Sequence, residues 1–230
     1  IFGSRIFSGG ALTAGGAMFG LAGLELLSTQ KLQLVDALSP LHAGLIISAM
    51  ALSAIPTSIL GGATLHRVGF LPLISGGFLL MAAGMALVVV SRGETLPLLV
   101  SGLGAGLAMS VSSTAIINAA PLHRTGMASG VEAVSYEFGT LISIALTGTL
   151  VPLLMARELP PHLAELGTDA LYHPASHAAA ASAYNAGYLS TIGGLACFAL
   201  LLAAITAWCF RDNPKSGDPY AATQQKDRSP

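Results

Sequence analysis

The chain has 230 residues, of which only 9% are charged, and its mean hydropathy is +0.72. An ordinary soluble domain carries roughly a quarter of its residues as charged side chains. So low a charge content excludes most cytosolic enzymes, nucleic-acid-binding proteins and disordered proteins. The net charge of −1 offers no basic surface for nucleic acid. The composition is that of an integral membrane protein.

Six long apolar stretches follow one another, each near or above the roughly 20 residues that a helix needs to cross a bilayer. Lipid offers no partners for backbone polar groups, so such uninterrupted runs are helices, and the alternating pattern of a membrane barrel is absent. We expect an all-α protein with six transmembrane helices in residues 1–211. The predicted spans are residues 6–28, 43–62, 71–90, 96–118, 126–155 and 187–210.

The basic residues predict the orientation of these spans. With the N-terminus in the cytoplasm, seven basic residues lie inside and three outside, which obeys the positive-inside rule. The seven are Arg5, Arg67, Arg124, Arg211, Lys215, Lys226 and Arg228, and the three are Lys31, Arg92 and Arg157. In this orientation residues 156–186 form an external loop, and residues 212–230 form a disordered cytoplasmic tail.

The chain begins at Ile1, without an initiator Met and without the basic segment of a signal peptide. Six spans with both ends in the cytoplasm form the unit from which half-transporters are built. We therefore expect a piece of a longer polypeptide, with further helices before Ile1.

Small residues recur four positions apart in three places, a spacing that lets helices approach closely in lipid. The pairs are Gly16 with Gly20, Gly102 with Gly106, and Gly126 with Gly130. They either pack helices inside the bundle or line an interface that moves.

Three acidic residues interrupt the apolar spans. A carboxylate near the bilayer centre costs about 2.5–3.5 kcal/mol on insertion scales, so it needs a reason to be there. Glu137 lies about 16 Å from the inner end of the fifth span, close to the midplane, and is either a proton-exchanging, cation-binding group or a protonated packing residue. Glu132 follows Ser129 with the spacing of a capping box, so it either closes a helix or joins the site. Glu25, near the outer end of the first span, either serves a proton pathway or reaches the surface.

Aromatic and soft side chains accompany these acids. Tyr136 lies one turn after Glu132 on the same helix face. Tyr136 and Phe138 flank Glu137 in the sequence, and aromatic faces attract organic cations. Met109 and Ser113 in the fourth span either line an adaptable cavity or take part in packing.

The tests for enzymes are largely negative. Ala128-Ser129-Gly130 resembles the serine neighbourhood of rhomboid-type intramembrane proteases, but the last span holds no histidine to act as base. His173 and His177 have the spacing of metal ligands, but no obvious further ligand accompanies them. The sequence has no phosphate-binding or dinucleotide-binding motif. We therefore expect no enzyme, metal site or cofactor.

Three segments resemble the fourteen-helix drug:proton antiporters of the major facilitator superfamily, and the resemblance extends over residues 1–211. The segment from Gly23 to Gly44 looks like the region of helices nine and ten. Gly61 to Gly69 is similar to the Gly…Asp-Arg-x-Gly loop of the superfamily, with His66 where Asp is usual. Gly126 to Gly139 resembles helix thirteen of methyl viologen and quaternary-ammonium pumps, with Ala133 in place of the second acid of a Glu-Glu pair.

The resemblance implies a major facilitator half-bundle, helices nine to fourteen of a multidrug exporter in a bacterial inner membrane. Such a pump expels lipophilic cations (quaternary ammonium compounds, dyes, viologens) in exchange for protons. Its other partners would be the bilayer and the missing N-terminal helices. Glu137, and after it Glu132 and Glu25, would couple protons to cations, while Arg67 and Gly69 would form the gate loop. A major facilitator transporter of another small solute is the alternative.

Overall fold

The computed structural model describes residues 5–91 and 95–210, and this part of the chain contains helices and no strands. Six of the helices are long and apolar enough to cross a membrane, so the predicted all-α bundle with six spans is confirmed. The long helices are α1 (Arg5–Leu34), α2 (Pro40–Val68), α3 (Phe70–Val90), α4 (Thr95–Asn118), α5 (Thr125–Glu158) and α7 (His177–Phe210). Short helical turns are η1 (Leu122–Arg124), α6 (Pro161–Ala164) and η2 (Gly167–Tyr172).

The last long helix differs most from its predicted bounds. It begins at His177, ten residues before the predicted start of the span 187–210. The added segment is rich in alanine, which favours helix but contributes little hydropathy, and it buries Tyr184 against the bundle. The predicted external loop 156–186 is accordingly reduced to residues 159–176, while the predicted tail 212–230 lies outside the described residues.

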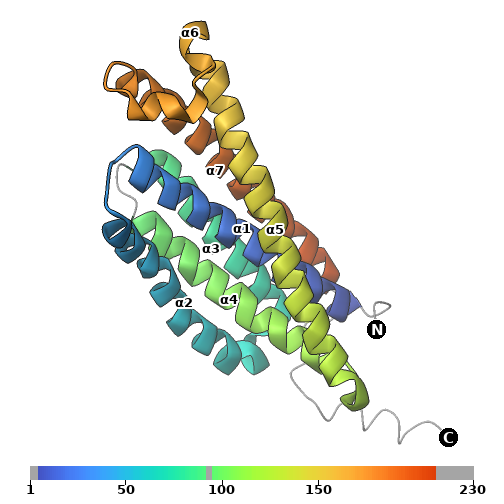
Figure 1. The fold of residues 1–230 in the computed structure, drawn as a ribbon. Helices are drawn as coiled ribbons and strands as arrows, with labels where there is room; N and C mark the ends of the chain where they lie inside the picture. Colours follow the sequence, from blue (N-terminus) through green and yellow to red (C-terminus); the bar gives the residue numbers. More distant parts are fainter. Residues whose placement is uncertain (1–4, 92–94, 211–230) are drawn as a thin grey trace, which may run out of the picture.

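The helices form two layers (Figure 1). Helices α4 and α1 lie in the middle of one layer, with α2 packed on α4 at one side and α5 packed on α1 at the other. Helices α3 and α7 form the second layer behind them. No described element covers the front of the first layer. We call this surface, made by α2, α4, α1 and α5, the open face.

The two ends of the bundle differ in charge and structure. Arg5, Arg67 and Arg124 lie where α1 begins, where α2 ends and just before α5 begins, and we call this the arginine end. The opposite end carries α6 and η2, and we call it the loop end (Figure 1). Lys31 and Arg157 lie in the last turns of α1 and α5, at the loop end.

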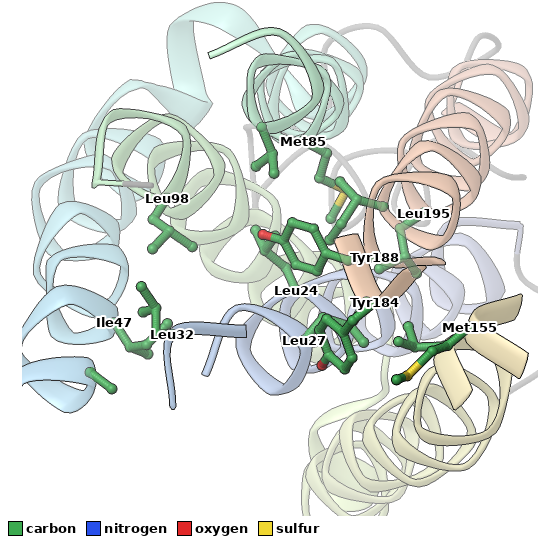
Figure 2. Packing of buried hydrophobic residues seen from close by; sticks show 14 of the residues in the cluster. Leu24, Leu27, Leu32, Ile47, Met85, Leu98, Met155, Tyr184, Tyr188 and Leu195 are labelled. Carbon is green, nitrogen blue, oxygen red and sulfur yellow. The ribbon is translucent and has the colours of Figure 1, made fainter. Parts of the chain in front are cut away.

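A large hydrophobic core joins the helices toward the loop end. Figure 2 shows side chains from all six long helices meeting there, around Leu24, Leu27 and Tyr188. Tyr188 is only 1% exposed, and its hydroxyl is hydrogen-bonded to the hydroxyl of Ser28 at 3.2 Å. Tyr184 donates a hydrogen bond to Gln30 at 3.3 Å. These contacts tie the start of α7 to the end of α1.

Glycines bring several of these helices close together. Added Cβ atoms at Gly102 and Gly106 of α4 would collide with the main-chain carbonyls of Met50 and Ala54 on α2. Side chains of α7 and α3 fill the space beside the first predicted pair, Gly16 and Gly20. The third pair, Gly126 and Gly130, has open space beside it. Two of the three predicted pairs therefore pack helices within the bundle, and the third faces outward.

Candidate functional site

Glu132 and Tyr136 form a hydrogen-bonded pair on α5. The Tyr136 hydroxyl donates to the Glu132 carboxylate at 3.1 Å, as their spacing of one turn predicts. The Tyr136 ring packs against a small cluster that includes Phe7 of α1 and Ile116 of α4. The capping-box interpretation of Glu132 is wrong, because α5 begins at Thr125 and Ser129 lies inside the helix.

Glu137 lies on the outward side of α5. Its side chain is exposed, and no hydrogen bond or ion pair connects it to any other residue that the structure describes. The opposite side of the helix is held against α1, where Gly139 contacts the main chain of Gly15. Glu137 shares its outward side with Gly126 and Gly130, beside which the space is open. The carboxylate therefore sits on the surface of this bundle, above a helix face of small residues.

Phe138 lines a shallow groove between α5 and α1, which we call the Phe138 groove. Its volume is about 550 Å³, and the Phe138 ring is 61% exposed. The lining is almost wholly apolar: Ala11, Met127, Gly130, Val131, Val134, Ser135 and Phe138. Of the four residues predicted to line a substrate cavity, Phe138 alone belongs to this groove.

The other three predicted lining residues lie elsewhere. Tyr136 turns inward, where its ring packs against side chains of α1 and α4. Met109 packs against the core cluster around Phe70 and Phe78. Ser113 is half-buried on α4. It lines neither the Phe138 groove nor the second groove, which lies between α1 and α2. These residues could be selected from the sequence by residue type. The direction in which each side chain points depends on how its helix is rotated in the bundle, which residue type does not determine.

Glu25 lies in a second groove, between α1 and α2, which we call the Glu25 groove. Its volume is about 440 Å³. The lining residues are Leu21, Glu25 and Thr29 of α1, and Gly44, Ile47, Ser48, Met50, Ala51 and Ala54 of α2. Sequence reasoning missed Thr29, although its position one turn after Glu25 is the signal that could have found it.

The contacts between α1 and α5 fix the relative heights of the two acids. These helices run parallel, since Gly15 meets Gly139 and the Ser143 hydroxyl donates to the Phe19 carbonyl with the same offset of 124 residues. Glu137 is therefore level with Thr13, twelve residues before Glu25. At 1.5 Å per residue, the two carboxylates are about 18 Å apart along the helix axes. Glu137 lies toward the arginine end, about 7 Å from the middle of α5, and Glu25 lies toward the loop end.

The predicted gate-loop residues lie together at the arginine end. Arg67 is exposed in the last turn of α2, and its Nε donates to Nε2 of His66 at 3.2 Å. Gly69 alone separates α2 from α3 and has a φ of 88°, a conformation that residues with a Cβ rarely adopt. The turn between α2 and α3 is therefore tight at this glycine.

The described residues contain no group of three or more His, Cys, Asp or Glu side chains that could hold a metal ion. No family model matches the chain.

Comparison with curated proteins finds drug-resistance proteins. The chain is 31% identical over 157 residues to the methyl viologen resistance protein SmvA of Salmonella typhimurium, which covers 66% of this chain and 32% of that protein. It is 31% identical over 220 residues to the puromycin resistance protein pur8 of Streptomyces alboniger, which covers 91% of this chain and 41% of that protein. The chain thus spans about a third of the length of the first of these relatives.

Comparison with solved structures gives the same fold. A bacterial homologue of the human lysosomal transporter Spinster, solved in an inward-facing and unoccupied conformation, matches with a TM-score of 0.66 and 15% identity. The match covers 94% of this chain and 50% of that structure. The six-helix bundle therefore corresponds to half of a larger transporter fold. The relatives are transporters rather than enzymes, so the serine-protease alternative drawn from Ser129 is set aside.

Proposed function

Since the chain is a homologue of drug-resistance transporters of the major facilitator type, we propose that it forms one half of a pump that exports lipophilic organic cations in exchange for protons. The observation that carries the proposal is the position of Glu137. This carboxylate stands exposed and without a described partner on a helix that is apolar enough to span the membrane.

An unpaired carboxylate on a membrane-spanning helix is unfavourable against lipid, since such groups almost always face a bundle interior or a water-filled cavity. We attribute the exposure to a second half-bundle that would pack against this one. Among the six long helices, α2 and α5 have the smallest buried fraction of their apolar membrane-spanning segments. A second half-bundle placed on the open face would cover both helices, and we propose that it also reaches around α5 to enclose Glu137, because transporters of this kind hold substrate between their two halves.

In that position Glu137 can be neutralised in two ways, by a proton or by an organic cation. The two compete for one negative charge, so binding of either weakens binding of the other, and this linkage is the basis of exchange. Phe138 follows Glu137 on the same exposed surface and offers an aromatic ring to a cation. Glu132 is the weaker candidate, because Tyr136 already donates a hydrogen bond to it.

The experiment uses the complete transporter that contains this chain, in energised inverted vesicles. The variant Glu137→Gln keeps the shape of the side chain and removes its titratable charge. We expect it to abolish export of ethidium and of quaternary ammonium compounds, and also the release of protons that export drives. Glu165→Gln, which changes an exposed acid in the loop after α6, is the matched control and should export at the wild-type rate.

Wild-type export by Glu137→Gln, with protein levels matched by blotting, would contradict the coupling role of this residue. Proton-coupled transport in the wild type without any export of organic cations would favour a major facilitator transporter of another small solute.

A further inference from the structure

The Glu25 groove is a second hollow of this bundle, and the role proposed for Glu137 does not involve it. It is a hollow of about 440 Å³ between α1 and α2, which lies within the usual range for small-molecule sites. Its walls are mostly apolar, with the flexible side chain of Met50 among them. Only Glu25, Thr29 and Ser48 bring polar side chains to it.

Glu25 is the one charged residue in the lining of this groove. No hydrogen bond or ion pair connects its carboxylate to another residue that the structure describes. The next basic residue along α1, Lys31, is engaged elsewhere: its Nζ lies 3.2 Å from the Asp36 carboxylate and 5.7 Å from the centre of the Tyr188 ring. The charge of Glu25 is therefore not balanced by this cation, and the groove is complementary to a cation from outside.

The groove composition indicates which kind of cation fits. Hard metal cations require about six oxygen ligands, and the groove offers far fewer. The Ser48 hydroxyl donates to the Leu45 carbonyl at 2.7 Å, so it can only accept from a ligand. A primary ammonium group is compact and strongly hydrated, and it offers no apolar surface to the side chains that make up most of the lining. A bulky cation without such donors, with apolar substituents and one delocalised or shielded charge, matches apolar walls around one carboxylate.

We propose that the Glu25 groove is a second binding site for a lipophilic organic cation, separate from Glu137. This inference rests on the proposed function for its class of ligand. The two carboxylates are about 18 Å apart along the helix axes, one toward each end of the bundle. One cation of the size of tetraphenylphosphonium cannot contact both, so the two carboxylates belong to separate sites.

The groove is formed within this chain, so the test needs no transport. The 230-residue chain is reconstituted in nanodiscs, and equilibrium binding of tetraphenylphosphonium is measured against empty nanodiscs. We expect saturable binding whose dissociation constant rises at least tenfold in Glu25→Gln and changes less than twofold in Glu165→Gln, which changes the exposed acid in the loop after α6. Ala51→Trp, which fills the groove and keeps the charge, should also lose binding. Tetraphenylborate has the same shape and the opposite charge, and should bind better to Glu25→Gln than to the wild type.

Chemical protection locates the ligand independently of affinity. In a chain whose two cysteines, Cys197 and Cys209, are replaced by serine, tetraphenylphosphonium should slow alkylation of Ser48→Cys in the Glu25 groove. It should leave alkylation of Ser182→Cys, at an exposed position on α7, unchanged. A single elution peak in size-exclusion chromatography checks that each variant is folded.

Unchanged binding in a folded Glu25→Gln chain, or alkylation of Ser48→Cys that the cation does not slow, would overturn the inference. These results are distinct from failure of the proposed function. Loss of proton coupling in vesicles leaves binding at Glu25 standing, and export through Glu137 without any binding in the groove refutes only the second site.

Discussion

The Tyr136 hydroxyl donates a hydrogen bond of 3.1 Å to the Glu132 carboxylate one turn earlier on α5. The next residue, Glu137, has no such donor among the described residues, although the two acids share one helix. Five residues of helix rotate their side chains by about 140°, so Glu132 meets the bundle and Glu137 leaves it. Substitutions at these two acids should therefore have different effects.

We expect Tyr136→Phe and Glu132→Gln each to lower the free energy of unfolding of the chain by about 1 kcal/mol, because each weakens the same hydrogen bond. Together they should cost less than the sum of the two, which a double-mutant cycle in mixed micelles measures. Glu137→Gln should change stability by less than about 0.5 kcal/mol. Strictly additive losses at Tyr136 and Glu132 would show that the hydrogen bond does not contribute.

Alanine at Gly102 and alanine at Gly148 should have opposite effects on stability. At Gly102 the new methyl group meets the main chain of Met50, and such overpacking costs about 1–3 kcal/mol. At Gly148 the space is open, and alanine favours helix over glycine by up to about 1 kcal/mol. Unfolding of the two variants by denaturant in mixed micelles gives the comparison. A Gly102→Ala chain as stable as the wild type would refute the close approach of α4 and α2.

Gly69→Ala should destabilise the turn between α2 and α3. The φ of 88° at this glycine lies in a region where other residues carry a cost of about 1–3 kcal/mol. Gly76→Ala, inside α3 with open space beside it, is the control and should be neutral or stabilising. The same unfolding assay applies, and equal stability of Gly69→Ala and the wild type would be the contrary result.

The orientation predicted from the basic residues is testable with single cysteines in a chain lacking Cys197 and Cys209. Ala175→Cys, exposed before α7, should react with a membrane-impermeant thiol reagent in intact cells. Leu122→Cys, at a side chain that is 92% exposed near the arginine end, should react only after permeabilisation. The reverse pattern would invert the orientation. Ser176 is unsuitable for this purpose, because it is 6% exposed and its hydroxyl donates to the Ala170 carbonyl.

The six spans could be predicted because hydropathy alone separates lipid-facing helices from loops. The start of α7 could not, since alanine, serine and asparagine before Gly187 carry little hydropathy and gain their burial only from contacts such as Tyr184 with α1. Mean hydropathy measures how favourably a segment transfers into lipid. It does not detect a helical segment that is stabilised by packing against another helix, because that packing depends on the fold.

The candidate site was predicted in part. The i,i+4 spacing identified the contact of Tyr136 with Glu132, because both residues belong to one helix. The Glu25 groove needed the pairing of α1 with α2, which no local pattern encodes. The capping-box prediction at Ser129 was wrong because α5 starts a turn earlier, at Thr125, and the same four-residue motif can occur within a helix.

The attachment of α2 to α4 has a consequence for how such a protein changes over generations. Gly102 and Gly106 meet carbonyl groups of α2, and the Ser110 hydroxyl donates to the Ser58 carbonyl at 2.7 Å. These contacts are made with the main chain, which every amino acid shares. Side chains on the outward side of α2 are therefore free to vary without moving the helix. Point mutations on that side can then change the lining of the Glu25 groove by small steps while the scaffold stays in place.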